Sequence, residues 1–300
     1  MPAEVTISPR KVQLTTRSGV EISRLIPHQQ LRAIGAWVFL DYYGPTNQRE
    51  AMSVGAHPHV GLQTVSWLFS GEIEHRDSLQ SSQLVNPGEL NLMTAGAGIA
   101  HSELSLDSTT ELHGVQLWTV LPESVRSMAP RFEHYSQLPH FRRGAMEIKL
   151  FTGDLLGHSS PATRYSELLG AEISFDEGSQ TTFDCQPDFE YGFLLIGGDL
   201  IVNGNAIAEG QLHYLPPATA LCEISSSSGA RVILLGGEPF REKIIMWWNF
   251  IGRTHEEIVA MRNDWNSRTP TIPVFADQIN YRIPAPELPA LQLTPRSLQR

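Results

Sequence analysis

The stretch Ala56-His57-Pro58-His59-Val60-Gly61 sets two histidines one residue apart, with a proline between them. A second stretch of similar shape, His101-Ser102-Glu103, comes later in the chain. In a β-strand the side chains at positions i and i+2 point to the same face, about 7 Å apart along the backbone. If the two stretches form neighbouring strands, three imidazoles and one carboxylate surround a single point.

Two interpretations of these histidines remain open on spacing alone. An isolated H-x-H pair is more often a pair of surface imidazoles than a pair of metal ligands. The glycine turns at Gly71, Pro87-Gly88, Gly96 and Gly98 favour metal ligands, because they let the intervening strands reverse and bring His101 back to His57 and His59. Imidazole and carboxylate together suit Fe(II), and also Mn, Ni, Cu or Zn.

Most of the chain is typical of short strands. Residues 11–22 (KVQLTTRSGVEI) predict a hairpin that turns at Ser18-Gly19, and Thr64–Phe69 and Glu111–Val120 predict further strands. Short strands separated by Gly, Pro, Asn and Ser indicate an all-β sandwich or barrel.

A weak internal repeat predicts two such units. Strand, glycine turn and strand follow one another in residues 69–92 and again in residues 195–215. We expect a first barrel with the histidines in residues 1–135 and a second barrel in residues 145–240. The predicted boundary lies near Ser136–Gly144.

Residues 241–300 predict a short helix and an extended tail that pack on the second barrel. Thr254-His-Glu-Glu257 is a capping-box pattern, followed by Ile258, Met261 and Trp265 at helical spacing, so the helix is expected over His255–Asn266. Trp247, Trp248 and Trp265 are expected to contact the second barrel. The tail after Ser267 is rich in proline and is expected to be extended.

Composition excludes several classes of function. The 300 residues are 41% hydrophobic, which is enough for a core, and the formal net charge of −10 disfavours direct nucleic-acid binding. We expect no membrane span and no export signal, and therefore a cytoplasmic protein. Cys185 and Cys222 are expected to be small buried side chains in a reducing compartment.

The run from His57 to Glu103 resembles a known family. The spacing from His57-Pro58-His59 to Gly71 resembles the first motif of cupin barrels, except that Thr64 stands where the motif has Glu. The full run, HPHVGLQTVSWLFSGEIEHRDSLQSSQLVNPGELNLMTAGAGIAHSE, together with GEPFRE at residues 237–242, resembles the pirin family. The segment MWWNFIG at residues 246–252 departs from the sequence expected of pirins there.

The resemblance implies a bicupin, with two cupin-type β-barrels, and one divalent metal ion in the first of them. The implied ligands are His57, His59, His101 and Glu103, with iron(II) as the first choice of metal. Two roles are associated with pirins. One is a quercetin 2,3-dioxygenase that cleaves a flavonol with O₂; for such an enzyme we expect Glu103 to bind metal in the resting state and to act as the base when substrate arrives. The other is a metal-dependent regulatory module that acts through a protein partner.

Other polar residues receive smaller roles. Counting from the repeated glycines places Asp184, Gln186 and Glu223 where the first barrel has its histidines. The second barrel is therefore predicted to lack a comparable metal site, and His213 is interpreted as an ordinary strand histidine.

Two interpretations remain open for His75 and Asp77. Either they orient a metal ligand, or they belong to a salt bridge at the end of a hairpin that includes Arg76. His113 and Gln116 are expected on the next strand, facing the barrel interior but not binding metal.

Overall fold

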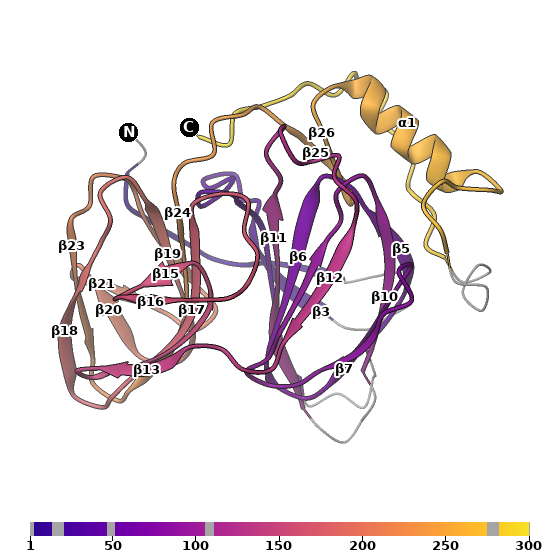
Figure 1. The fold of residues 1–300 in the computed structure, drawn as a ribbon. Helices are drawn as coiled ribbons and strands as arrows, with labels where there is room; N and C mark the ends of the chain where they lie inside the picture. The colour runs from indigo at the N-terminus through magenta and orange to yellow at the C-terminus, as the bar shows by residue number, and fades with distance from the viewer. Residues whose placement is uncertain (1–2, 14–20, 47–51, 106–110, 275–281, 300) are drawn as a thin grey trace.

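The structure is a computed structural model that describes residues 3–13, 21–46, 52–105, 111–274 and 282–299. It contains two β-barrels in one chain, followed by a hairpin and a helix (Figure 1). The predicted all-β fold with a short C-terminal helix is therefore confirmed.

The first barrel combines a seven-stranded sheet with a four-stranded sheet. Across the larger sheet the strands are β12 (Arg131–Tyr135), β9 (Leu90–Thr94), β6 (Leu62–Ser70), β11 (Leu112–Val120), β4 (Trp37–Thr46), β3 (Glu21–Ile26) and β2 (Arg10–Gln13). Across the smaller sheet they are β5 (Ser53–His59), β10 (Ile99–Ser105), β7 (Ile73–Asp77) and β8 (Ser82–Val85).

The second barrel repeats this plan. Its seven-stranded sheet contains β1 (Val5–Ile7), β22 (Leu212–Leu215), β19 (Glu190–Gly198), β24 (Ala230–Gly237), β17 (Leu168–Phe175), β14 (Met146–Thr152) and β13 (His140–Arg143). Its four-stranded sheet contains β18 (Ser179–Asp184), β23 (Leu221–Ser226), β20 (Leu200–Val202) and β21 (Asn205–Ile207). The remaining elements are the hairpins β15 (Asp154–Leu155) with β16 (His158–Ser159) and β25 (Ile245–Trp247) with β26 (Phe250–Gly252), and the helix α1 (His255–Asn266).

The two barrels match strand for strand with one exchange. The edge position that β12 fills beside β9 in the first barrel is filled in the second by β1, which pairs with β22. The expectation that the whole N-terminal region belongs to the first barrel is thus wrong for β1. The physical reason is that the edge of β22 needs a partner for its backbone groups, and Ile7 is fully buried there.

The predicted N-terminal hairpin forms from β2 and β3, with Val12 opposite Ile22. Its expected turn at Ser18-Gly19 lies outside the described residues. The last strand of the first barrel ends at Tyr135 and the next strand begins at His140.

The barrels share a continuous core. Trp37 of the first barrel is fully buried, and its indole N–H donates to the backbone oxygens of Leu169 and Gly236 in the second, at 3.1 and 3.2 Å. The indole N–H of Trp67 likewise donates to the buried carboxylate of Glu172, at 2.7 Å. These polar groups are satisfied across the interface, so the interface orients the barrels as well as burying apolar surface.

The helix begins where the sequence predicts, but it packs on the other barrel. The Glu257 backbone N–H donates to the Thr254 hydroxyl at 3.2 Å, which caps the helix. Ile258 and Trp265 are fully buried in a cluster with Val60 and Ala100 of the first barrel. The expectation of packing on the second barrel is therefore wrong, because helical periodicity identifies a buried face but not its partner.

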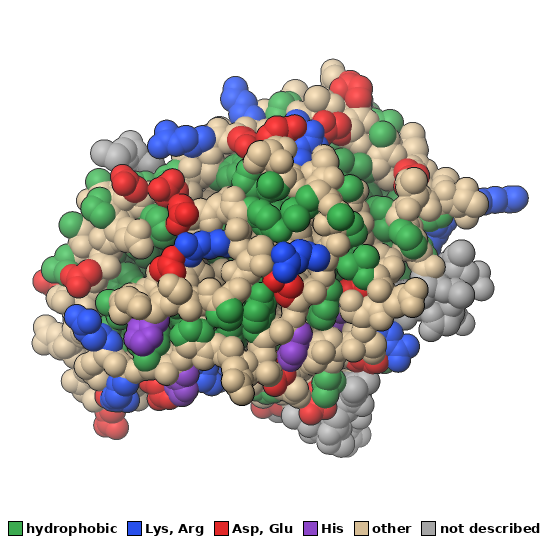
Figure 2. All heavy atoms as spheres, viewed as in Figure 1, with side chains coloured by type: hydrophobic (Ala, Val, Ile, Leu, Met, Phe, Trp, Pro, Cys, Tyr) green, Lys and Arg blue, Asp and Glu red, His purple; other side chains and the backbone are tan. Residues whose placement is uncertain are grey.

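The surface carries both signs of charge. On the face drawn in Figure 2, Lys and Arg side chains lie among Asp and Glu side chains. No helix among the described residues is long and apolar enough to cross a membrane.

Candidate metal centre

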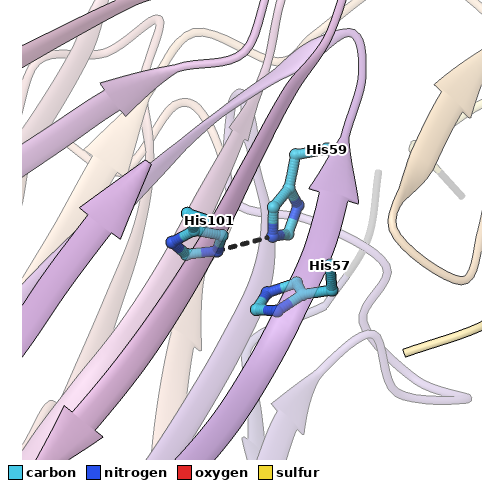
Figure 3. A group of neighbouring side chains, drawn as sticks. All are labelled: His57, His59 and His101. Atoms are coloured by element: carbon cyan, nitrogen blue, oxygen red, sulfur yellow. Dashed lines mark hydrogen bonds between the residues drawn. The ribbon is translucent and has the colours of Figure 1, made fainter. Parts of the chain in front are cut away.

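Three histidines meet where β5 and β10 lie side by side (Figure 3). His57 and His59 project from β5 to the same face, and His101 faces them from β10, opposite His57 in the register. One ring nitrogen from each lies within 4.8 Å of the others. Alternation along paired strands therefore produces the convergence that the H-x-H spacing suggests.

Glu103 belongs to a second group that overlaps the first. The register between β5 and β10 shifts between His101 and Glu103. The Glu103 carboxylate, His101 and His75 have ligand atoms within 4.8 Å of one another, and the Ser66 hydroxyl donates to Glu103 at 3.4 Å. The structure thus brings all four predicted ligand residues to one region, with His101 shared between the two groups.

Burial keeps the imidazoles neutral. Loss of solvent lowers the pKa of His57 to about 4 and lowers the pKa values of His59 and His101 well below 6.5, and neighbouring imidazoles add to the effect for both. Burial also raises the pKa of the Glu103 carboxyl, although His75 and the Ser66 hydroxyl oppose that change. Neutral imidazoles offer the lone pairs that a metal ion needs.

The geometry of these nitrogens fits a divalent metal ion. His59 Nε2 and His101 Nε2 are 3.1 Å apart. Two nitrogens that bind one ion at about 2.1 Å, at a right angle, lie about 3.0 Å apart. The His57 Nδ1–H donates to the Gly55 backbone oxygen at 2.9 Å, which leaves its Nε2 lone pair free. His59 Nδ1 is buried and has no hydrogen-bond partner among the described residues.

A cavity of about 940 Å³ opens onto these residues. Its walls include the aromatic rings of Phe39, Trp118 and Trp248, and the rings of Phe39 and Trp118 stack with centroids 3.9 Å apart. Part of the wall comes from the far end of the chain, through Trp248, Asn249, Arg282, Ile283, Pro284 and Pro286.

Several polar side chains of this cavity were not predicted from the sequence. Arg24 donates two hydrogen bonds to Asp41, both at 2.7 Å, and Tyr43 places a buried hydroxyl in the wall. Tyr43 and Asp41 lie on β4, where Trp37–Tyr43 form a nearly continuous apolar run that signals burial but not a role in a cavity. Gln116, expected to face the interior, also lines the cavity and accepts from Ser66 at 3.0 Å.

Five further residues singled out in the sequence have structural contacts. His113 lies 2.9 Å from the Tyr42 hydroxyl and is not part of the cavity wall. His213 is buried on β22 between Thr6 and Glu4, at 2.8 and 2.7 Å. His75 and Asp77 contact each other at 3.1 Å, whereas Arg76 pairs with Glu74.

In the second barrel, strand pairing identifies the residues that correspond to the metal centre, and they are not the residues obtained by counting from glycines. On β18 and β23, Phe183 lies opposite Cys222 as His57 lies opposite His101, and both side chains are buried. By alternation, Cys185 and Ile224 then match His59 and Glu103. Asp184, Gln186 and Glu223 are exposed, so the count placed the equivalence one residue off and on the opposite face.

The comparisons with known proteins agree with this architecture. The profile of the Pirin family matches residues 19–119, and that of the Pirin C-terminal cupin domain matches residues 170–270. A Pseudomonas aeruginosa protein named "Putative quercetin 2,3-dioxygenase" is 43% identical over 249 residues, which are 82% of this chain and 79% of that protein. A pirin-like protein of Caulobacter vibrioides is 31% identical over 264 residues, which are 84% and 90% of the two chains.

The solved structures point to the same family. The crystal structure of a quercetin 2,3-dioxygenase from Acinetobacter baumannii shares 36% sequence identity and a TM-score of 0.92, covering 98% of each chain. With two barrels of matching strand order, a histidine cluster in the first of them and these relatives, the chain belongs to the pirin family of bicupin proteins.

Proposed function

We propose that this protein is a metal-dependent dioxygenase of the quercetin 2,3-dioxygenase type, acting on quercetin or a related flavonol. The proposed ligands of one divalent ion, with Fe(II) as the first choice, are His57, His59, His101 and Glu103. The observation that carries the proposal is the cavity of about 940 Å³, which reaches all four of these residues. A module that only senses metal would not need an open path from solvent to the ion.

The shape and chemistry of the cavity suit a flat aromatic substrate. Phe39, Trp118 and Trp248 offer ring faces and edges for stacking, and Gln116 and Tyr43 offer polar groups beside them.

A bound divalent ion would supply Lewis acidity toward the flavonol hydroxyl and a place to hold O₂ beside it. The Glu103 carboxylate then accepts the proton of that hydroxyl, because it lines the cavity beside His101. In the overall reaction both atoms of O₂ enter the products, the flavonol ring opens to an ester of two aromatic acids, and one carbon leaves as carbon monoxide.

The test uses protein purified without oxygen and loaded with Fe(II). We expect oxygen uptake and carbon monoxide release with at least one member of a flavonol panel. Glu103→Gln nearly keeps the shape and removes the charge, so we expect retained metal and a loss of turnover of at least about 100-fold. His101→Ala should lose metal and turnover together, whereas His158→Ala, on the exposed hairpin of the second barrel, should lose neither.

Wild-type protein that holds Fe(II) but consumes no oxygen with any flavonol would overturn the proposal. A pull-down that compares metal-loaded with metal-free protein would then test the regulatory role directly.

A further inference from the structure

A line of hydrogen-bonding side chains leads from His101 away from the cavity. His101 Nδ1 lies 3.3 Å from His75 Nδ1, and His75 Nε2 lies 3.1 Å from Asp77 Oδ2. The other carboxylate oxygen of Asp77 accepts from the backbone N–H groups of Leu79 and Ser81, at 2.8 and 3.1 Å. His75, Asp77 and His101 are at most 3% exposed.

The fold fixes this line at both ends. β7 lies beside β10 with Asp77 opposite His101, and alternation turns His75 and Asp77 to the same face. The His75 ring stacks on Phe132, with centroids 4.4 Å apart and an angle of 14° between the planes. The turn after β7 holds the Asp77 carboxylate through the two backbone N–H groups, so neither the ring nor the carboxylate is free to rotate.

The direction of the hydrogen bonds follows from the end of the line. One oxygen of the Asp77 carboxylate accepts from the Leu79 and Ser81 backbone N–H groups, and the other faces His75 Nε2, so the group is an acceptor at both oxygens. A neutral His75 ring that donates to Asp77 through Nε2–H has its lone pair on Nδ1, the atom that faces His101. His101 must donate to that lone pair through its own Nδ1–H, and its Nε2 is therefore the free ligand atom.

We propose that His75 and Asp77 are positioning residues that hold His101 in the tautomer whose Nε2 lone pair faces His57 and His59. The proposal rests on the metal centre of the proposed function and adds how one ligand is prepared. His57 is prepared in the same sense by its Nδ1–H bond to Gly55. A carboxylate that orients a metal-binding imidazole is a common arrangement; here a second imidazole stands between the two.

The same atoms allow a rival arrangement. His75, His101 and Glu103 have ligand atoms within 4.8 Å of one another and form a possible second ion site. If His101 Nδ1 donates a proton to His75, it cannot bind a second ion. The two arrangements therefore predict different metal stoichiometries, one ion per chain and two.

The experiment uses Co(II) as the probe, because its visible spectrum reports the ligand set and needs no turnover. Asp77→Asn keeps the size and an oxygen for the two backbone N–H groups, but its amide NH₂ donates to His75 and reverses both tautomers. We expect one Co(II) per wild-type chain and about a 10- to 100-fold weaker affinity in Asp77→Asn. Nitrogen-15 NMR of the metal-free wild type should show the proton of His101 on Nδ1.

Asp199→Asn is the matched control. Asp199 also accepts from two backbone N–H groups, those of Ser227 and Ser228 at 2.9 and 2.6 Å, but it lies in the second barrel. It should bind Co(II) like the wild type and with the same spectrum, even if it is less stable.

Three results would overturn the proposal: unchanged Co(II) affinity in Asp77→Asn, two Co(II) ions per wild-type chain, or an Nε2–H tautomer of His101. The NMR measurement decides the matter even if Asp77→Asn does not fold. A protein that binds Co(II) as expected but oxidises no flavonol would leave this inference standing while the proposed function fails.

Discussion

At the scale of single residues, Tyr43 buries a hydroxyl group, which costs stability, in the wall of the cavity. Its side chain is 2% exposed, and its hydroxyl has no hydrogen-bond partner among the described residues. Burial, with the charges of Glu103 and Asp41, raises its pKa well above 10.0, so the group stays a donor. Tyr43→Phe should therefore raise the free energy of unfolding by about 1 kcal/mol in urea denaturation. If the hydroxyl contacts the flavonol, kcat/KM falls in the same variant.

Tyr42 provides the control, because its substitution should change the free energy of unfolding in the opposite direction. The Tyr42 hydroxyl lies 2.9 Å from His113 Nε2, so Tyr42→Phe removes a made hydrogen bond and should lower the free energy of unfolding by about 1 kcal/mol. A lower stability for Tyr43→Phe as well would show that its hydroxyl has a partner in solution.

Asp199 gives a pH-dependent prediction at the same scale. Hydrogen bonds from the backbone and hydroxyl groups of Ser227 and Ser228 lower the pKa of its carboxyl from 3.8. A depressed folded-state pKa stabilises the fold above the unfolded value, and this stabilisation is lost as the pH falls. Asp199→Asn should therefore be less stable than the wild type at neutral pH. The difference should shrink between about pH 5 and about pH 3 in denaturation curves; a difference that stays constant over this range would argue against the assignment.

At the scale of elements, the hairpin of β25 and β26 depends on one glycine of the first barrel. Gly61 has a φ of +76°, and a Cβ there would lie 2.5 Å from the Ile251 backbone oxygen. This hairpin is held by the bond from Ile251 N–H to the Val60 oxygen, at 3.0 Å, and its turn carries Trp248 and Asn249 of the cavity wall. Gly61→Ala should thus cost more than backbone strain alone and should raise KM for the flavonol.

Gly204 is the matched control for that prediction. Its φ is +77°, but a Cβ there meets nothing within 4 Å. The left-handed backbone should lower the free energy of unfolding by about 1–2 kcal/mol in both Gly61→Ala and Gly204→Ala. Any further loss in Gly61→Ala is then the cost of displacing the hairpin. If thermal unfolding shows the same loss of stability in both variants, the hairpin does not depend on Gly61.

The elements also show what sequence could and could not predict. Alternation within a strand is local, so H-x-H and the glycine turns indicate the convergence of His57, His59 and His101 as one of two interpretations, and the resemblance to pirins favours it. The residues of the second barrel that correspond to the histidines could not be predicted from the sequence. A count of loop residues that is wrong by one moves every side chain of a strand to the other face. The count from glycines therefore predicts Asp184 at the position that the strand pairing gives to Phe183.

At the scale of the whole molecule, the cavity is assembled from both ends of the chain. The sequence placed the C-terminal helix correctly but assigned it to the wrong barrel, since a buried face does not name its partner. Contacts between distant segments, such as the bond from Ile283 N–H to the Ala56 oxygen at 2.7 Å, carry no local signal. The part of the candidate site least predictable from sequence is therefore the outer wall of the cavity.

That outer wall gives the last prediction. We call residues 282–299 the C-terminal strap; Ile283, Pro284 and Pro286 in it line the cavity. Asn266 of α1 joins the strap by two hydrogen bonds with the Ala285 backbone, both at 2.9 Å. Asn266→Ala removes both bonds and should loosen the wall without touching the metal ligands. We expect KM for the flavonol to rise about fivefold, equivalent to about 1 kcal/mol, with kcat and metal content unchanged.

Asn263→Ala tests whether the effect belongs to the strap and not to the helix. Asn263 lies on α1 as well, but its side chain accepts only from the neighbouring Arg262, at 3.3 Å, among the contacts described. It should leave KM unchanged, because the two Asn266 bonds to Ala285 remain, and so does the bond from Arg262 Nε–H to the Pro286 oxygen at 2.5 Å. If both variants raise KM alike, the helix itself and not the strap shapes the cavity. If Asn266→Ala lowers metal content, the strap supports the metal centre directly, and the separation of wall from ligands proposed here fails.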